Sequence, residues 1–285
     1  MATDANAKVA VTGPYGRLGS ELVRRGCIPV DAIITDMDVL NNQLSEIDPD
    51  VVVHCAALTK VDECEMMPDH AARINAGGPF NLCSRFKGKI VYISTDYIFD
   101  GRHGPYSEND RPNPISVYGW SKLGGEIVLK NRGNSDDLTV RTTMLFDAHS
   151  RNFVTVIASL LRCGGRLSLP NLLIGSPTYI PRLVDGLLEA IKQDVSGTVN
   201  LAGWRVMSRW EFGQYIADAL GTDRQKVVAT EDVGGRAPRP LNAGLRIDRA
   251  RSLGLPIGDP LDGLEEVINC LGESGSWATQ LRSTA

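Results

Sequence analysis

A glycine-rich turn between a strand-like segment and a helix-like segment constrains the fold of this chain most. Residues 8–12 (KVAVT) are a short β-rich run, and residues 18–25 (LGSELVRR) carry apolar side chains at helical spacing. Between them Gly13, Gly16 and Gly19 follow a GxxGxxG pattern. Strand, tight turn and helix in this order predict the first unit of an α/β fold with a parallel sheet.

The same glycines predict a dinucleotide site. Glycine permits the tight turn, lets a pyrophosphate approach the backbone, and leaves the amides of the helix N-terminus directed at it. Glycines at this spacing also occur in simple turns, so the prediction depends on the flanking strand and helix. The residues of the turn that we predict to bind NAD(P)(H) are Gly13, Tyr15, Gly16, Arg17, Leu18 and Gly19.

Strands and helices continue to alternate through the first half of the chain. Residues 51–55 (VVVHC) and 89–94 (KIVYIS) are apolar runs bounded by turn residues, as buried parallel strands are. A helix is predicted over residues 116–130, because Asn-Pro precedes it and Asn-Arg-Gly follows it. Residues 138–142 (LTVRT) are predicted to form another strand.

Beyond about residue 145 this rhythm loosens, with one predicted helix over residues 153–162 and later Pro-rich turns. We expect a Rossmann-like doubly wound parallel sheet with a smaller, irregular C-terminal lobe that binds substrate. The predicted NAD(P)-binding domain comprises residues 1–145 with return segments near 176–203, and the predicted substrate-binding lobe comprises residues 146–175 and 204–285. The composition after about Gly272 is that of a frayed end.

Composition and charge exclude several function classes. Hydrophobic residues make up 42% and charged residues 22%, the balance of an ordinary globular protein. The net charge of -4 and the lack of a long basic run argue against a nucleic-acid partner. Because the sequence has no apolar stretch of about 20 residues and no apolar core of a signal peptide near its start, we expect no membrane segment and a cytoplasmic location.

Cysteines and histidines give no sign of a metal site. The six cysteines form no CxxC pair, and the four histidines are scattered without ligand spacing. The sequence therefore predicts reduced, mostly buried thiols and no metal.

A YxxxK pattern lies in the helix predicted over residues 116–130. Tyr118 and Lys122 are one turn apart on the same face. A tyrosine with a pKa of about 10 is a weak acid at neutral pH, but a neighbouring cation such as Lys122 lowers that pKa and favours acid–base catalysis. For an isolated YxxxK, a half-buried aromatic beside a solvated lysine is the commoner arrangement, so this prediction depends on other motifs.

The segment STDYIFDG, residues 94–101, begins at the end of a predicted strand. Open α/β sheets present their ligand-binding residues at this edge. Thr95, Asp96 and Tyr97 are therefore candidate site residues, although Asp96 is equally well suited to forming a turn.

With the glycine turn, STDYIFDG and the YGWSK helix in this order, the sequence resembles the dTDP-4-dehydrorhamnose reductase family of extended short-chain dehydrogenases. The resemblance covers about residues 8–271. Further similar segments are VHCAALTKVD (53–62), NAGGP (75–79), GSPT (175–178) and PRPLN (238–242).

The resemblance implies roles for particular residues. Tyr118 would donate a proton to a substrate carbonyl oxygen, Lys122 would tune Tyr118 and hold the nicotinamide ribose, and Thr95 would hydrogen-bond the same oxygen. Further implied cofactor-binding residues are Asp36, Ala56, Ala57, Asn75 and Ser94, beside Tyr118 and Lys122. The implied substrate-binding residues, for a nucleotide-linked sugar, are Thr95, Asp96, Tyr97, Met144, Arg239 and Asn242.

The sequence departs from the family pattern in three places. Only residues 26–34 are available for the second strand and its loop, and no acid for the ribose is clearly identifiable beyond Asp31. Since Arg17 is suited to a ribose phosphate, NADPH is predicted as cofactor, with NADH as the alternative. Met144 stands where the family has a tryptophan, and a polar stretch is replaced by Asn171-Leu172-Leu173.

Three functions remain open at this point. The first is an NAD(P)H-dependent reductase that converts the 4-keto group of a nucleotide-linked deoxysugar to an alcohol. The second is a non-catalytic NADP-binding regulatory subunit like the beta subunit of methionine adenosyltransferase. The third is a nucleotide-sugar epimerase or dehydratase, which regenerates its cofactor. The resemblance also implies a homodimer.

Overall fold

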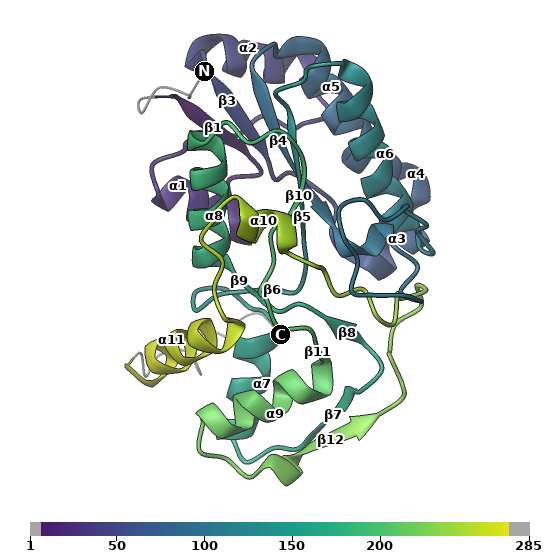
Figure 1. Cartoon of the computed structure of the whole chain (residues 1–285), viewed down its shortest axis with the longest axis vertical. Coiled ribbons are helices and arrows are strands. Elements are labelled where there is room, and N and C mark those ends of the chain that lie inside the picture. The colour runs from purple at the N-terminus through teal and green to yellow at the C-terminus, as the bar shows by residue number, and fades with distance from the viewer. Residues whose placement is uncertain (1–6, 274–285) are drawn as a thin grey trace.

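A computed structural model describes residues 7–273 of the chain. Residues 1–6 and 274–285, including the end for which fraying was predicted, lie outside the described residues. The molecule has a larger lobe built on a six-stranded sheet and a smaller lobe beneath it in the view of Figure 1. This arrangement confirms the predicted α/β fold with a Rossmann-like parallel sheet.

The strands of the large sheet lie in the order β10-β5-β4-β3-β1-β2, and all neighbouring pairs are parallel. The order reverses around β1, so that β2 lies on one side of it and β3 on the other. In such sheets the ligand crevice opens where the order reverses, outside the carboxyl ends of the strands. The strands are β1 (Val9–Thr12), β2 (Ile28–Val30), β3 (Val51–His54), β4 (Lys89–Thr95), β5 (Leu138–Thr142) and β10 (Gly197–Asn200).

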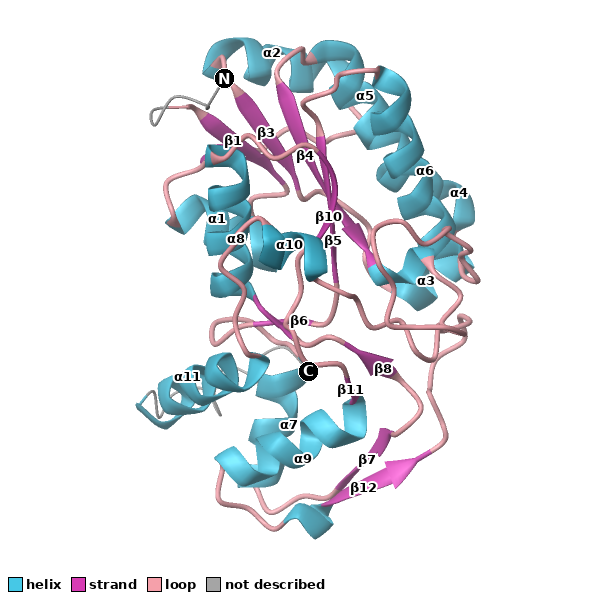
Figure 2. Ribbon diagram, viewed as in Figure 1, coloured by secondary structure: helices cyan, strands magenta, loops and turns pink. Residues whose placement is uncertain are grey.

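Helices cover both faces of this sheet (Figures 1 and 2). On one face α1 (Arg17–Arg24), α8 (Ile180–Lys192) and α10 (Asp248–Ser252) share a core with side chains of β1, β3, β4 and β5. On the other face α2 (Met37–Ile47), α5 (Gly78–Arg85) and α6 (Val117–Arg132) cover the alternate side chains of the strands. Burial on both faces explains why these strands are apolar runs rather than alternating patterns.

Local sequence explains the bounds of α6, the helix that carries the YxxxK pattern. The Ser116 hydroxyl accepts a hydrogen bond from the amide of Gly119 at 3.2 Å and caps the helix. Gly133, with φ at +75°, ends it in the left-handed conformation. The helix predicted over residues 116–130 is confirmed and extends two residues further.

Between β3 and β4 the chain forms short helices that pack under α6. These are α3 (Val61–Met66), α4 (Pro68–Ala72) and the π-helical turn η1 (Arg73–Gly77), which leads into α5. The 3-10 turn η2 (Asp96–Ile98) follows β4 directly. Cys64, Ala71 and Tyr118 form a small buried cluster here, so these segments hold Tyr118 from the side opposite the sheet.

The smaller lobe has its own core, centred on Phe146 and Phe212. Its helices are α7 (Phe153–Arg162), α9 (Arg209–Ala219) and α11 (Pro260–Glu273), with the 3-10 turn η3 (Arg224–Lys226). Its short strands pair as β7 (Leu167–Pro170) with β12 (Val227–Thr230), β8 (Ile174–Gly175) with β11 (Met207–Ser208), and β6 (Leu145–Phe146) with β9 (Thr178–Tyr179).

The large lobe takes residues from several separate parts of the chain. The return segments near 176–203 contain α8 and β10, which belong to the large sheet and its core. Leu245, Ala250 and Leu255 also pack into that core rather than into the core of the smaller lobe. The chain therefore crosses between the lobes more often than the sequence indicated.

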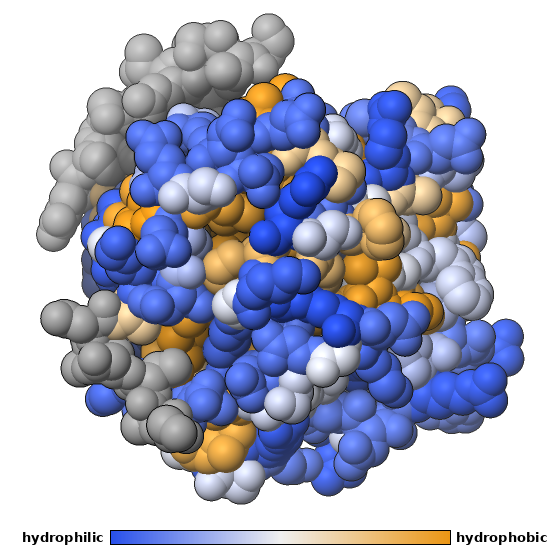
Figure 3. All heavy atoms as spheres, turned by 90° about the horizontal axis from the view of Figure 1, so that it is seen from above, coloured by the Kyte–Doolittle hydropathy of each residue, from blue (hydrophilic) through white to orange (hydrophobic). Residues whose placement is uncertain are grey.

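The surface seen from above in Figure 3 is mostly hydrophilic, with hydrophobic patches between. Within residues 7–273 no helix is both long enough and apolar enough to cross a membrane. None of the six cysteines forms a disulfide within the described residues, but the prediction that most of them are buried is wrong. Only Cys27 and Cys64 are buried, and Cys163 and Cys270 are exposed. The exposed cysteines lie at the ends of the peripheral helices α7 and α11.

Candidate active site

The cavity of interest, about 560 Å³ in volume, opens at the carboxyl ends of the sheet strands, between the two lobes. It brings together most of the residues predicted from the sequence. Those that line it are Gly13, Gly16, Arg17, Leu18, Gly19, Ala57, Ser94, Thr95, Asp96, Tyr97, Tyr118, Lys122, Met144 and Arg239. The predicted residues that do not line it are Tyr15, Asp36, Ala56, Asn75 and Asn242.

The glycine turn forms one end of the cavity. Gly13 has φ at +67°, and a Cβ added there would lie 2.8 Å from backbone atoms of Ala56 on the neighbouring β3 connection. A Cβ on Gly19 would collide with the carbonyl oxygen of Gly13. Gly16 caps α1 without a side chain, which leaves the first amides of that helix accessible. This close, side-chain-free backbone at a helix N-terminus fits the pyrophosphate of a dinucleotide.

Tyr118 lies in the same cavity and is 8% exposed. Its ring meets that of Tyr97 edge-on, with the centroids 5.5 Å apart. Burial raises the pKa of Tyr118 well above 10, and its side-chain contact with Thr95 partly offsets this. The lowering of that pKa expected from the sequence is therefore wrong for the protein without cofactor, because desolvation of the phenolate outweighs the stabilising contacts.

Lys122 is buried one turn after Tyr118. Its Nζ donates to the carbonyl oxygen of Ile93 at 2.7 Å and lies 4.2 Å from the centroid of the Tyr92 ring. Burial lowers the pKa of Lys122 to about 7, although Glu126 opposes this. Lys122 therefore gains and loses its proton near pH 7.

Asp96 follows Thr95 at the end of β4 and is 5% exposed. Its Oδ1 accepts from the Thr95 hydroxyl at 3.0 Å, and its Oδ2 accepts from the Thr143 hydroxyl at 2.6 Å. Burial raises the pKa of Asp96 to about 6, and the two threonine hydroxyls hold it from rising further. Asp96 is therefore a cavity residue as well as the first residue of the turn η2.

A buried ion pair lies behind Lys122. Glu126, one turn further along α6, accepts from Arg141 at 2.8 and 3.0 Å and from the Ser94 hydroxyl at 2.5 Å. Because Arg141 neutralises Glu126, Lys122 has a carboxylate nearby without being paired to it. Ser94, predicted to bind the cofactor, lines the cavity, and its hydroxyl donates a hydrogen bond to the Glu126 carboxylate.

Arg239 reaches the cavity from a loop that follows β12. Its Nη2 donates to Asp62 at 2.8 Å, and its Nη1 lies 3.4 Å from the Tyr97 hydroxyl. Asp62 also accepts from the amides of Arg236 and Ala237, and these amides lower the pKa of Asp62. The loop is thereby fastened to α3 beside the cavity.

Asn242, from the same PRPLN segment, lies outside the cavity. Its side-chain amide donates to the carbonyl oxygen of Gly104 at 3.1 Å. The structure thus separates Arg239, which faces the cavity, from Asn242, which joins two loops.

Met144 lies at the floor of the cavity and has φ at +47°. A Cβ added to Gly175 would lie 2.8 Å from its sulfur, so the glycine at this position makes room for the methionine. Leu173 also lines this part. Met144 and Leu173 therefore line the cavity with apolar side chains at positions where the family pattern has a tryptophan and a polar stretch.

Sequence reasoning missed several lining residues. Thr143 immediately follows β5, so the rule that ligand residues follow strand ends was a usable signal for it. Arg151, Phe153 and Arg209 come from the smaller lobe, and the Arg209 guanidinium lies over the Phe153 ring at 5.5 Å. No spacing in the sequence marked these three residues.

The two acidic residues that follow the second strand, Asp31 and Asp36, have different surroundings in the structure. Asp31 directly follows β2, and the Tyr15 hydroxyl of the glycine turn hydrogen-bonds to it, which raises the pKa of Tyr15. Asp36 instead caps α2, accepting from the amides of Asp38 and Val39 at 3.2 and 3.1 Å. The acid beside the glycine turn is therefore Asp31.

Asn75 is buried behind the site. Its side-chain oxygen accepts from the amide of Leu58 at 2.8 Å, and its nitrogen donates to the carbonyl of Leu58 and to the Ser121 hydroxyl, both at 2.9 Å. With these bonds the amide ties α6 to the segment after β3. It supports the helix that carries Tyr118 and Lys122.

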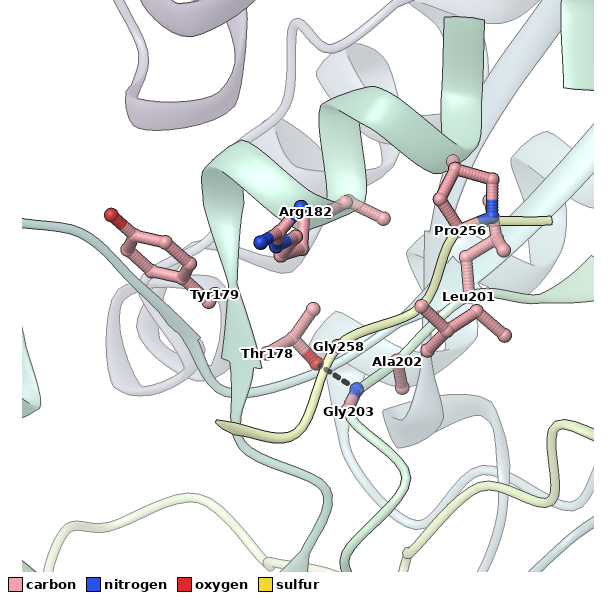
Figure 4. Close-up of a pocket in the computed structure, with 11 residues that line it drawn as sticks. Thr178, Tyr179, Arg182, Leu201, Ala202, Gly203, Pro256 and Gly258 are labelled. Carbon is pink, nitrogen blue, oxygen red and sulfur yellow. Dashed lines mark hydrogen bonds between the residues drawn. The ribbon is translucent and has the colours of Figure 1, made fainter. Parts of the chain in front are cut away.

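A second, small crevice lies where the start of α8 meets residues 201–203 and 256–258 (Figure 4). The amide of Gly203 donates to the Thr178 hydroxyl there at 3.1 Å. Tyr179 at its rim donates to Glu266 of α11. Among the described residues none of the predicted site residues lines this crevice, and its contacts join α8 to the neighbouring segments.

The main cavity combines a phosphate cradle at one end with a buried phenol, ammonium and carboxyl at the other. Guanidinium groups of Arg17, Arg151, Arg209 and Arg239 line it as well. This distribution suits an anionic ligand with two or more phosphates and a proton transfer at the Tyr118 end.

Comparison with known proteins adds independent findings. A family model described as RmlD substrate binding domain matches residues 7–271. The chain is 30% identical over 280 residues to a dTDP-4-dehydrorhamnose reductase of Mycolicibacterium smegmatis, covering 92% of this chain and 85% of that protein. It is also 30% identical over 278 residues to methionine adenosyltransferase 2 subunit beta of Danio rerio, covering 88% and 86%.

The fold is also similar to solved structures. A crystal structure of dTDP-4-dehydrorhamnose reductase from Bacillus anthracis in complex with NADP superposes with a TM-score of 0.86 at 32% identity, covering 92% of this chain and 99% of that one. The similarity therefore extends over both lobes.

Proposed function

The chain belongs to the RmlD substrate binding domain family, and from this membership we propose that it is an NAD(P)H-dependent reductase of a nucleotide-linked 4-keto-deoxysugar. Relatives at 30% identity or more that carry the name dTDP-4-dehydrorhamnose reductase support this activity. A similar structure that holds NADP supports NADPH as the cofactor.

The observation that carries the proposal is the convergence of three side chains on a cavity that ends at the glycine turn. Tyr118, Thr95 and Lys122 come from α6 and β4, and all line that cavity. The glycine turn lies at its other end, so a dinucleotide held there would reach toward Tyr118.

Each of these residues has a distinct part in the reaction. The reduced nicotinamide, when bound, supplies the hydride. Tyr118 donates its phenolic proton to the carbonyl oxygen as negative charge develops there, and Thr95 hydrogen-bonds the same oxygen. Lys122 holds the ribose and, once charged, stabilises the Tyr118 phenolate.

The arginines and the apolar floor would orient the sugar nucleotide. Arg151, Arg209 and Arg239 are suited to its diphosphate, since guanidinium groups pair with phosphate oxygens in a planar, bidentate way. Met144 and Leu173 offer a deoxysugar an apolar contact. Fixing both reactants in this cavity removes much of the entropic barrier to hydride transfer.

A second candidate function is a nucleotide-binding regulatory subunit. The similarity to methionine adenosyltransferase 2 subunit beta over most of the chain and the apolar floor at Met144 favour it. An epimerase or dehydratase that regenerates its cofactor stays a prediction, as do a homodimer and a cytoplasmic location.

The test is NADPH consumption with dTDP-, GDP- and UDP-linked 4-keto-deoxysugars. We expect stoichiometric oxidation with one of them, and a loss of about 100-fold in kcat for Tyr118→Phe. Tyr215→Phe, which alters a tyrosine of α9 outside the cavity, is the matched control. Binding of NADPH without oxidation would favour the regulatory subunit, and turnover without net oxidation would favour the epimerase or dehydratase.

A further inference from the structure

Asp96 is a buried carboxyl group in the cavity for which the reaction described above has no use. Both of its oxygens accept hydrogen bonds from neutral hydroxyl groups, those of Thr95 and Thr143. The positive charge of Arg209 lowers the pKa of Asp96 less than the hydrogen bonds from Thr143 and Thr95 do. A carboxyl group held by two hydroxyls in a desolvated place is suited to exchange a proton rather than to anchor a charge.

The Thr95 hydroxyl connects Asp96 to Tyr118. It donates to Asp96 at 3.0 Å, accepts from the amide of Tyr97 at 3.2 Å, and lies within hydrogen-bonding reach of the Tyr118 phenol. A hydroxyl has one proton to donate and two lone pairs. When Asp96 is ionised, that proton is committed to Asp96 and is not available to Tyr118.

Protonation of Asp96 reverses the direction of this chain. The carboxylic acid then donates to Thr95, whose second lone pair is filled by the Tyr97 amide. The Thr95 proton becomes free. It bonds the substrate carbonyl oxygen while the hydride is transferred, and it turns to the oxygen of Tyr118 once Tyr118 has lost its proton. All three bonds of the Thr95 hydroxyl are satisfied in this arrangement, which is the one needed when Tyr118 has lost its own proton.

Two other polar side chains near Tyr118 are engaged by neighbours in the described structure. The Asn75 amide is fully used by Leu58 and Ser121. The Lys122 ammonium commits one of its three N–H groups to the carbonyl of Ile93.

We propose that Asp96 is a proton-relay residue, which in its neutral form restores through the Thr95 hydroxyl the proton that Tyr118 gives to the substrate. The inference rests on the proposed reductase function. It gives Asp96 a role in proton supply that is separate from any contact with the sugar.

Each turnover delivers one hydride and one proton to the carbonyl group. A bound reduced nicotinamide would supply the hydride for the new C–H bond at the carbonyl carbon, and the Tyr118 O–H bond breaks as its proton passes to the carbonyl oxygen. The phenolate takes the Thr95 proton while Thr95 takes the proton of the Asp96 carboxylic acid. Asp96 is left ionised and takes a proton from water at the open cavity, so one solvent proton is consumed per alcohol formed.

The surroundings of Asp96 give its neutral form a substantial population in mildly acidic solution. The groups that face it are the Tyr118 phenol on α6, the Arg209 guanidinium at the start of α9, and the neighbouring phenol of Tyr97, with Lys122 and Arg239 also lining the cavity. Burial raises the pKa of Asp96 to about 6. About half of the carboxyl groups are then neutral at pH 6 and about a tenth at pH 7.

The first measurement reads the carboxyl group directly, without turnover. Protein labelled with ¹³C at the aspartate carboxyl carbons is titrated by NMR, and Asp96→Asn assigns the signal. We expect a midpoint near pH 6, and a higher midpoint in Thr143→Val, because the Thr143 hydroxyl lowers the pKa of Asp96. A midpoint below about pH 4 in the folded protein overturns the proposal, since an ordinary ionised aspartate has no proton to supply.

The second measurement is the pH dependence of kcat. We expect kcat of the wild type to fall as the pH rises through about 6, and Asp96→Asn to lose this limb and about tenfold in kcat at pH 6, with a smaller change in KM. Thr143→Val should move the limb to higher pH. Thr95→Ser should keep it and Thr95→Val should abolish it, because only serine retains the connecting hydroxyl.

Two negative results have different meanings. An Asp96→Asn variant with the wild-type limb contradicts the relay alone. A wild-type protein that oxidises NADPH with no keto-sugar contradicts the proposed function and the relay with it.

Discussion

The Arg17 guanidinium donates to the carbonyl oxygen of Leu145 at 2.9 Å and so joins the glycine turn to β6 across the cavity. Arg17 is the first residue of α1, and Leu145 begins the passage of the chain into the smaller lobe. The sequence had suggested that Arg17 meets a ribose phosphate. Because the guanidinium is held at the start of β6 instead, we expect it to meet a part of the dinucleotide that NADH and NADPH share.

Replacement of Arg17 should therefore weaken both dinucleotides equally. Arg17→Ala removes a charge-assisted contact, and we expect about tenfold weaker binding of NADPH and of NADH, measured by isothermal titration calorimetry. Arg24→Ala, at the exposed end of the same helix, is the control. A loss confined to NADPH would show that Arg17 reads the 2′-phosphate after all.

Asp31 should determine the preference between the two dinucleotides. It directly follows β2, where an acid in this fold accepts from the ribose 2′-hydroxyl and repels a 2′-phosphate. We expect Asp31→Asn to shift the ratio of the NADH and NADPH dissociation constants about tenfold in favour of NADPH. Asp36→Ala, which removes the side-chain cap of α2, should lower stability without altering that ratio.

Dinucleotide binding should take up protons at neutral pH. Burial lowers the pKa of Lys122 to about 7, and bound phosphates would raise it by favouring the charged form. At pH 7 we expect an uptake of about half a proton per binding event, which vanishes below about pH 5.5, where the amine is already charged. Calorimetry in buffers of different ionisation enthalpy measures it.

A matched pair of variants tests the origin of this proton. Lys122→Met should abolish the uptake, whereas Lys130→Met, at the exposed end of α6, should leave it unchanged. Wild-type binding with the same heat in every buffer would rule out the lowered pKa of Lys122.

The buried pair of Glu126 and Arg141 should be more sensitive to the loss of one partner than of both. The two side chains are 10% and 6% exposed, so Arg141→Met leaves an unpaired buried carboxylate. We expect a loss of about 3–5 kcal/mol in the free energy of unfolding, measured with urea. The double variant Glu126→Gln with Arg141→Met should recover part of it.

An exposed ion pair provides the contrast. Arg246, which is 57% exposed, pairs with Asp248, which is 62% exposed, at 2.7 Å, and Arg246→Met should lower the free energy of unfolding by about 1 kcal/mol or less. Equal losses for Arg141→Met and Arg246→Met would mean that burial does not govern the strength of these pairs.

Neighbouring residues in the sequence determined the strands, the glycine turn and the YxxxK helix. The apolar run of residues 51–55, the glycines that no Cβ could replace at positions 13 and 19, and the stop at Gly133 each act within a few residues. Such signals depend on local backbone conformation and on periodicity. They placed Tyr118 and Lys122 on one helix face and the fold in its class.

Tertiary structure alone decided how the site behaves. Thr143 lies 47 residues from Asp96 in the chain, and Arg209 comes from the smaller lobe, so no local pattern relates them to the STD segment. The raised pKa of Tyr118 has the same origin, because it follows from burial among distant segments rather than from the lysine one turn away. Desolvation and hydrogen bonding depend on everything that packs around a group, and this packing exists only once the chain has folded.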